Sequence, residues 1–119
     1  MKLMVVDDSS VMRRAIQRYA SSLDLEVVGT AKDGEQALAL FRQQSPDVVT
    51  LDITMPKMDG LATLKAILAE RPTTRVLVVT ALSDSATGIQ ALRLGAKGFL
   101  NKPFTEAELT EELTHVMES

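Results

Sequence analysis

The sequence predicts an α/β domain with a mainly parallel, doubly wound five-stranded sheet, and three observations lead to this prediction. Five short apolar segments alternate with five segments in which apolar residues recur at helical spacing. Such alternation is typical of parallel sheets whose strands are joined by helices. The first, third and fourth apolar segments are almost free of charge, as expected of central strands covered on both faces, whereas the second and fifth are mixed or short and are expected at the edges.

Length and composition exclude several classes of protein. We expect one domain spanning residues 1–119, which is long enough to bury a core without disulfides, and the chain has no cysteine. No signal peptide pattern and no apolar run near the roughly 20 residues of a membrane span is present, so a cytoplasmic protein without membrane contact is expected. The net charge of -3 and aromatic content of 3% argue against nucleic-acid binding.

The predicted strands are apolar runs that stop at a polar or turn-forming residue. The first, Leu3–Val6, runs into Asp7, and the third, Val48–Asp52, ends in a carboxylate before a turn that contains Pro56. The other three strands are Leu25–Val28, Arg75–Thr80 and Gly98–Leu100.

The first predicted helix is amphipathic and extends from Ser9 or Ser10, both good N-cap residues, to about Ser22. Its apolar face comprises Val11, Met12, Ala15, Ile16, Tyr19 and Ala20. Its solvent face comprises Arg13, Arg14, Gln17 and Arg18.

The next two helices have recognisable ends. The second begins at Asp33 and ends at Ser45-Pro46, and it buries Ala37, Leu38 and Phe41. The third begins near Asp59 and stops before Pro72; its buried residues are Leu61, Leu64, Ile67 and Leu68.

The fourth helix, from about Asp84 to Leu94, is capped by Gly95 and contains Gly88. A glycine inside a helix costs about 1 kcal/mol relative to alanine, so we expect this helix to move most easily. Thr105 and Glu108 form a capping box that opens the last helix, which buries Leu109, Leu113 and Val116.

Charged and hydroxyl side chains follow the strands at the points where they end. In an open doubly wound sheet, ligands bind outside the carboxyl ends of the strands where the strand order reverses, which would bring Asp7, Asp8 and Asp52 together. Carboxylates this close need a cation, and an all-oxygen set suits Mg²⁺, Ca²⁺ or Mn²⁺. Lys102 and Thr80 would hold phosphoryl oxygens, and a carboxylate can itself accept a phosphoryl group.

The chain resembles the receiver domains of two-component response regulators over its whole length, most closely the single-domain, CheY-like chemotaxis members of that family. Four motifs, each at a strand end, support the resemblance: Val5–Arg14, Leu51–Gly60, Thr80-Ala81 and Lys102–Phe104. The resemblance implies a flavodoxin-like fold with strand order 2-1-3-4-5.

The resemblance also implies roles for individual residues. Asp52 matches the phosphoacceptor. Asp7, Asp8 and Asp52, with the backbone carbonyl of Thr54, match the Mg²⁺ ligands. Thr80 matches the switch hydroxyl that moves toward the phosphoryl group, and Lys102 matches the lysine that pairs with it. The family usually has a cis bond at the position of Lys102-Pro103.

Three positions depart from the family pattern or vary within it. Phe99 matches the aromatic residue whose rotamer reports activation, but the chemotaxis members have tyrosine there, so a hydroxyl contact to a partner is missing. Thr54 and Leu82 occupy variable positions that influence how long the phosphoryl group survives.

The resulting hypothesis is a phosphorylation-activated signalling switch, not a conventional enzyme. A histidine kinase would donate the phosphoryl group to Asp52, and the surface of the fourth helix, fifth strand and fifth helix would then change for a downstream protein. If the chemotaxis resemblance holds, that protein is a flagellar motor switch component. We expect the protein to be a monomer.

Three alternatives stay open. The chain could be the receiver part of a longer regulator with a separate output domain, or a degenerate receiver that only docks. A Mg²⁺-dependent phosphatase with an aspartate nucleophile, like the haloacid dehalogenase superfamily, usually needs a second carboxylate where this chain has Thr54. Taken individually, each of these residue types is more often structural at a strand end: aspartate forms turns, threonine favours strands, and lysine lies in solvent.

Overall fold

The computed structural model describes residues 1–54 and 59–119, and of Leu82 only the backbone. The motif residues 55–58, including the Pro56 turn, and the side chain of Leu82 lie outside the described residues. Five parallel strands form one sheet in the order β2-β1-β3-β4-β5, as predicted. The strands are β1 (Lys2–Val6), β2 (Glu26–Ala31), β3 (Val48–Asp52), β4 (Arg75–Ala81) and β5 (Gly98–Lys102).

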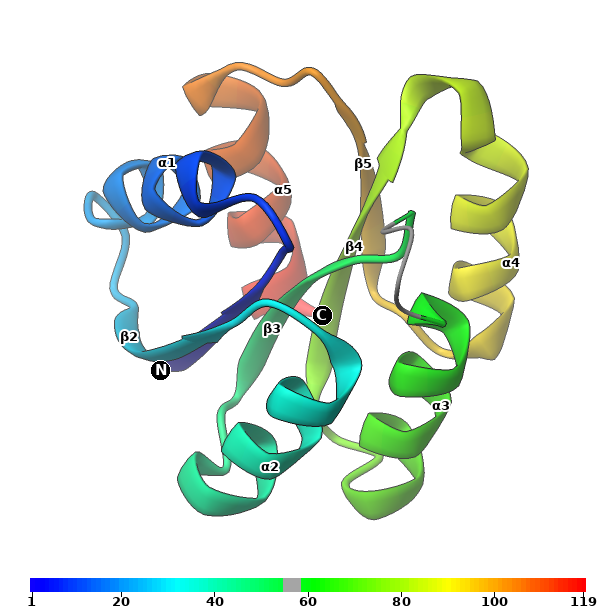
Figure 1. Ribbon diagram of the computed structural model, residues 1–119. Helices are drawn as coiled ribbons and strands as arrows, with labels where there is room; N and C mark the ends of the chain where they lie inside the picture. Colours follow the sequence, from blue (N-terminus) through cyan, green and yellow to red (C-terminus); the bar gives the residue numbers. More distant parts are fainter. Residues whose placement is uncertain (55–58) are drawn as a thin grey trace.

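Helices cover both faces of this sheet (Figure 1). The helices are α1 (Ser10–Ala20), α2 (Gly34–Gln44), α3 (Gly60–Glu70), α4 (Ser85–Leu94) and α5 (Glu106–Glu118), and a 3-10 turn, η1 (Leu82–Asp84), precedes α4. Helices α1 and α5 pack on one face, and α2, α3 and α4 pack on the other. This three-layer arrangement confirms the predicted doubly wound fold.

The strands separate two apolar cores because successive side chains point to opposite faces. Along β1, Leu3 and Val5 face α1 and α5, whereas Met4 and Val6 face the other three helices. All three core residues predicted for the last helix are buried, and β1, β3 and β4 are central as expected.

The helix ends follow the local chemistry of the sequence. Asp33 accepts a hydrogen bond from the Gln36 backbone N–H, and Thr105 and Glu108 form the predicted capping box. Gly95 ends α4 with φ 118°, a left-handed conformation that glycine adopts without strain. The Lys102-Pro103 peptide bond is cis, as the resemblance implied.

The extent of β2 was predicted wrongly. The strand covers Glu26–Ala31 instead of Leu25–Val28, and it continues through Gly29. A side chain at Gly29 would approach Leu40 of α2 within 2.7 Å, so glycine here allows the helix to pack directly on the strand.

The first helix also differs from its predicted pattern. Val11 was assigned to the buried face but is 68% exposed, because it lies in the first turn, ahead of the part of α1 that buries Ile16 and Ala20. Arg13 and Gln17, assigned to solvent, are half-buried. The helix ends at Ala20, before Ser22.

Candidate functional site

The carboxyl ends of the parallel strands form one edge of the sheet, which we call the rim. Asp7 and Asp8 directly follow β1, Asp52 is the last residue of β3, and Lys102 is the last residue of β5. Thr80 lies one residue before the end of β4. The rim therefore collects all five side chains that the sequence placed there.

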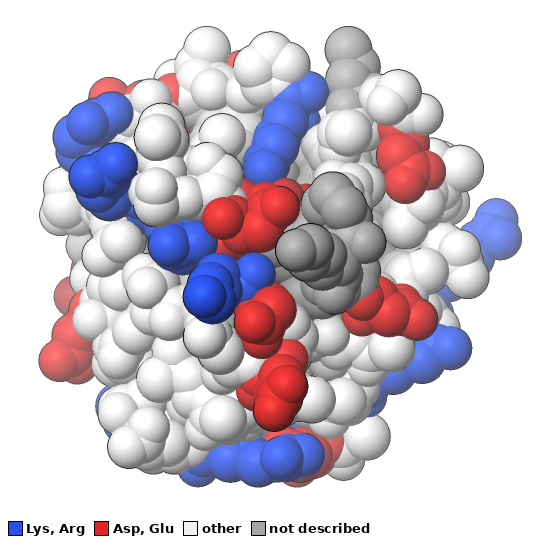
Figure 2. All heavy atoms as spheres, in the orientation of Figure 1, with Lys and Arg blue, Asp and Glu red and all other residues white. Residues whose placement is uncertain are grey.

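Three carboxylates meet at the rim. Asp7, Asp8 and Asp52 each have an oxygen within 4.8 Å of the others. Asp7 and Asp52 are buried and Asp8 is exposed. Figure 2 shows acidic side chains gathered near the middle of this face, with basic side chains beside them.

Lys102 bridges the two buried carboxylates. Its Nζ lies 2.8 Å from Oδ2 of Asp7 and 2.8 Å from Oδ2 of Asp52. Burial would lower the pKa of Lys102, but the hydrogen bonds to Asp52 and Asp7 outweigh it and raise that pKa. One ammonium group thus pairs with two of the three carboxylates, and the cluster of Lys102, Asp7, Asp8 and Asp52 carries more negative than positive groups.

Burial penalises the ionised form of Asp7. Burial raises the pKa of the Asp7 carboxyl, although hydrogen bonds from Lys102 and from the Ser9 backbone N–H act in the opposite direction. A carboxyl group that burial penalises beside two further carboxylates is stabilised by a hard cation with oxygen ligands. The donor set therefore fits Mg²⁺, with Asp7, Asp8 and Asp52 as the side chains that could hold it.

Asp52 is oriented through both of its carboxylate oxygens. Oδ2 accepts the hydrogen bond from Lys102, and Oδ1 accepts bonds from the backbone N–H (2.9 Å) and the hydroxyl (3.0 Å) of Thr54. The Thr54 hydroxyl also accepts a hydrogen bond from the Ala81 N–H, which links β3 to the end of β4. Thr54 therefore contacts the acidic site through its side chain, in addition to the backbone carbonyl predicted as a metal ligand.

Thr80 is held by a residue that sequence reasoning missed. The Asn101 side-chain amide donates to the Thr80 hydroxyl at 2.7 Å, and Thr80 is buried. Within the described part of the chain, no hydrogen bond joins Thr80 to Asp52. Asn101 lies opposite Thr80 because β4 and β5 pair in this register. Asparagine is disfavoured inside strands, so its presence in β5 was the sequence feature that could have indicated a special role for this residue.

Arg13 is a second residue that the sequence did not place at the site. Its Nη1 donates to the backbone carbonyl of Asp7 at 2.7 Å. A long side chain near the start of α1 can reach back over the end of β1, because helical side chains point toward the helix N-terminus. The guanidinium group therefore brings a positive charge to the rim and holds the Asp7 backbone.

Phe99 lies away from the carboxylates, between β5 and α4. It is half-buried, and a side chain at Gly88 of α4 would approach its Cδ2 within 2.8 Å. The glycine in α4 therefore provides room for the Phe99 ring. The switch role of Phe99 stays a prediction.

The chain is similar to known proteins over most of its length. Residues 3–114 match the response regulator receiver domain family. The chain belongs to this family. It is 40% identical over 113 residues to the chemotaxis protein CheY of Listeria monocytogenes, covering 95% of each chain.

Other similar receiver domains occur in different contexts. A protein-glutamate methylesterase/protein-glutamine glutaminase of Nitratidesulfovibrio vulgaris is 43% identical over 109 residues, which are 90% of this chain and 30% of that protein. The receiver domain of AraT, a response regulator from Geobacillus stearothermophilus, superimposes with a TM-score of 0.90 at 32% identity, covering 98% of this chain and 92% of that one.

Receiver domains are signalling switches that act between histidine kinases and downstream targets. The described part of this receiver domain contains no helix long and apolar enough to cross a bilayer. The relatives differ in what they control, so membership of the family leaves the output of this receiver domain open.

Proposed function

We propose that this receiver domain is a phosphorylation-activated switch that accepts a phosphoryl group on Asp52 from a histidine kinase. The observation that carries the proposal is the bridge from Lys102 Nζ to Asp7 and Asp52, both at 2.8 Å. A cation anchored beside a buried carboxylate is placed to neutralise the charge that arrives with a phosphoryl group.

In the proposed reaction, an oxygen of Asp52 attacks the phosphorus of a phosphohistidine. A new P–O bond forms, the P–N bond breaks, and its electron pair leaves with the imidazole nitrogen, which takes a proton from solvent. Mg²⁺ held by Asp7, Asp8 and Asp52, with the Thr54 carbonyl, would supply charge neutralisation for the phosphoryl oxygens. Thr54 orients Asp52 by donating to Oδ1, and Lys102, which donates to Oδ2 of Asp52, would pair with the phosphoryl oxygens.

The response to phosphorylation would pass through Thr80 and Phe99. Thr80 would leave Asn101 and donate its hydroxyl to the phosphoryl group, and the Phe99 ring would adjust against Gly88. Both residues lie on strands that border α4, so the surface formed by α4, β5 and α5 would change for a downstream protein. In a cytoplasmic chemotaxis pathway, that protein is a flagellar motor switch component.

The test is incubation with Mg²⁺ and a small acyl phosphate, followed by intact mass measurement. We expect a single phosphoryl adduct that requires Mg²⁺, decays with time and is absent from Asp52→Asn. Asp33→Asn is the matched control, because Asp33 caps α2 and asparagine caps equally well. Lack of an adduct on a folded wild-type protein would contradict the assignment of Asp52 and favour a docking module.

Two alternatives predict different outcomes. Sustained release of inorganic phosphate from many donors would support the phosphatase. Its usual second carboxylate is replaced here by Thr54, whose hydroxyl donates to Asp52. The other alternative is a receiver within a longer regulator: the match covers 30% of the methylesterase relative but 95% of the CheY relative, and an intact gene that continues into an output domain would support this alternative.

A further inference from the structure

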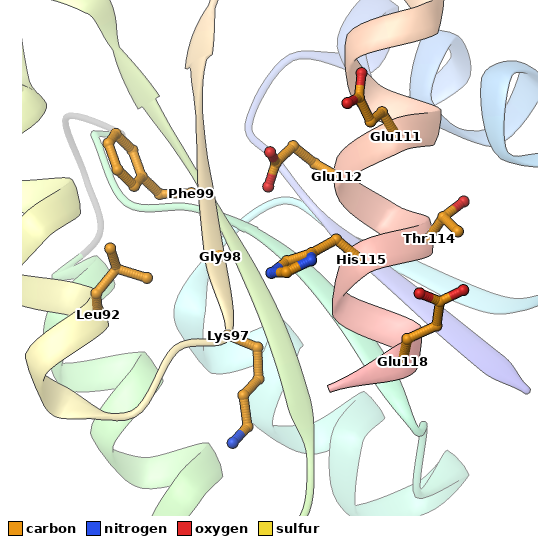
Figure 3. A pocket seen from close by; sticks show the side chains of 9 residues that line it. All are labelled: Leu92, Lys97, Gly98, Phe99, Glu111, Glu112, Thr114, His115 and Glu118. Atoms are coloured by element: carbon orange, nitrogen blue, oxygen red, sulfur yellow. The ribbon is translucent and has the colours of Figure 1, made fainter.

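A groove between α4 and α5 lies on a different part of the molecule from the rim. It has a volume of about 510 Å³, and β5 forms its floor. Its lining includes Leu92, Lys97, Phe99, Glu112, His115 and Glu118. Figure 3 shows Glu112 and His115 reaching from α5 toward β5, with Leu92 and Phe99 on the opposite side.

The α4 side of the groove is apolar and open to solvent. Leu92 lines the groove and is 36% exposed, and Ile89, one turn earlier on α4 and beside the lining residues, is 47% exposed. These are two of the four large hydrophobic residues that are exposed in the described part of the chain. Phe99 continues this apolar side to the floor of the groove. Neighbouring exposed apolar side chains at a concave surface are characteristic of a protein-binding site.

The α5 side of the groove is acidic. Glu111, Glu112 and Glu118 line the groove from α5, and the helix contains no lysine or arginine. Among the described residues that line the groove, the single lysine or arginine is Lys97, which directly precedes β5. The lining therefore carries a net negative charge, with apolar side chains facing it.

Glu112 is the groove glutamate that lies closest to β5 in the structure. It is half-buried, and its Oε2 lies close to the strand, 3.2 Å from the position that a Cβ on Gly98 would occupy. None of the ion pairs found among the described residues involves Glu112 or the other two groove glutamates. A half-buried carboxylate without a cation retains electrostatic attraction for an incoming positive group.

We propose that the groove binds a basic, amphipathic segment of a partner protein. An apolar side chain of that segment packs on Leu92 and Phe99, and its lysine or arginine side chains pair with Glu112 and Glu118. A helix laid between α4 and α5 offers this combination, with apolar anchors on one face and basic residues beside them. The inference rests on the proposed function for its regulation, and it specifies the chemistry of the partner.

Phosphorylation is coupled to this groove through Phe99. The ring lines the groove and also lies against Gly88, so a change in its rotamer alters both the floor of the groove and the position of α4. The affinity for the basic segment therefore differs between the two phosphorylation states, and linkage requires the segment to affect phosphorylation in return.

The test compares two synthetic helical peptides with the same leucine positions, one carrying lysines and the other glutamates at the remaining face. Each is titrated into the ¹⁵N-labelled full chain with Mg²⁺, with and without acyl phosphate, and amide shifts are followed by NMR. We expect the lysine peptide to shift resonances of α4, β5 and α5, and to bind more weakly as salt is added. The glutamate peptide is expected to leave these resonances unchanged.

The variants Glu112→Gln and Glu118→Gln test the charge pairs. Each is expected to weaken binding of the lysine peptide roughly threefold to tenfold, as partly desolvated charge pairs do. Glu35→Gln is the control, because Glu35 is an exposed glutamate on α2, away from the groove, and it should leave the affinity unchanged.

Equal binding of the two peptides, binding of neither, or an equal effect of Glu35→Gln would overturn the inference. The phosphoryl adduct is measured by mass in the same samples, which separates the two proposals. A charge preference without an adduct contradicts only the proposed phosphorylation at Asp52. An adduct without a charge preference contradicts only the basic partner.

Discussion

The rim and the groove are both acidic, but their carboxylates differ in burial and in ion pairing. At the rim, Asp7 and Asp52 are buried and share the ammonium group of Lys102. In the groove, Glu112 and Glu118 lack an ion pair within the described structure and remain at least partly open to solvent. A buried charge requires an internal partner for the protein to fold, whereas an accessible charge can be left for an external one. The comparison predicts that rim substitutions affect stability and groove substitutions affect binding.

The largest effect is expected from Lys102→Met, which keeps the length of the side chain and removes its charge. Asp7 and Asp52 would then face each other and Asp8 without a cation, and we expect a loss of about 2–4 kcal/mol in the free energy of unfolding. Urea denaturation measures this loss, and added Mg²⁺ should restore part of it. Lys65→Met, at an exposed position of α3, is the control. Equal losses for the two variants would contradict the structural role of the bridge.

The next prediction concerns the pH dependence of stability in the presence of a chelator. Burial raises the pKa of Asp7 in the folded protein above the ordinary value of an aspartate side chain, so the folded state binds its proton more tightly than the unfolded state does. The stabilising contribution of protonated Asp7 is complete below the unfolded pKa and is lost as pH rises through the folded pKa.

Asp7→Asn should remove this loss. Urea midpoints measured from pH 3.5 upward, in steps of about half a unit, should therefore show the wild type losing stability relative to Asp7→Asn as pH rises. Mg²⁺ should reduce the difference at neutral pH. A wild type that gains stability relative to the variant over this range would show that hydrogen bonding, and not burial, dominates at Asp7.

A smaller effect on stability is expected from loss of the hydrogen bond between Asn101 of β5 and Thr80 of β4. Asn101→Ala removes the donor to Thr80, and the loss of one buried hydrogen bond is expected to cost about 1 kcal/mol. A double-mutant cycle with Thr80→Val should give a coupling energy of roughly 0.5–1.5 kcal/mol. Additive effects would mean that Asn101 does not restrain the Thr80 hydroxyl.

The smallest effect on stability is expected in the groove. Glu112→Gln removes a charge that has no ion-pair partner in the described structure, so the free energy of unfolding should stay within about 0.5 kcal/mol of the wild type. Thermal or urea denaturation is sufficient to measure it. A loss larger than about 1 kcal/mol would place Glu112 among the structural charges and remove the distinction between the two regions.

Much of the fold could be read from local sequence patterns. Capping at Asp33, Thr105 and Gly95 depends on interactions within a few residues, and the structure has all three caps. The order of elements and the central position of β1, β3 and β4 follow from apolar runs that are too uniform for an edge strand. The meeting of Asp7, Asp8 and Asp52 was also predictable, because parallel strands end at the same edge of the sheet.

Several features of the site depended on contacts between residues distant in sequence. Asn101 meets Thr80 only because β4 and β5 pair in one particular register. Arg13 reaches Asp7 through a side-chain conformation that helical periodicity does not specify, and periodicity assigned it to solvent. Lys102 was expected to pair with a phosphoryl group, and the structure shows that its ammonium group also bridges Asp7 and Asp52.

The sequence by itself therefore determined which strands are central, where most helices are capped, and that Asp7, Asp8, Asp52, Thr80 and Lys102 lie at the rim. These properties arise from apolar periodicity and from hydrogen bonds between near neighbours. Tertiary structure alone decided which charges are paired. Glu112 and Asp7 are both acidic residues next to apolar positions, yet only Asp7 has a lysine within 2.8 Å. That difference arises from packing, since burial and the distance to an opposite charge are set by the arrangement of whole elements.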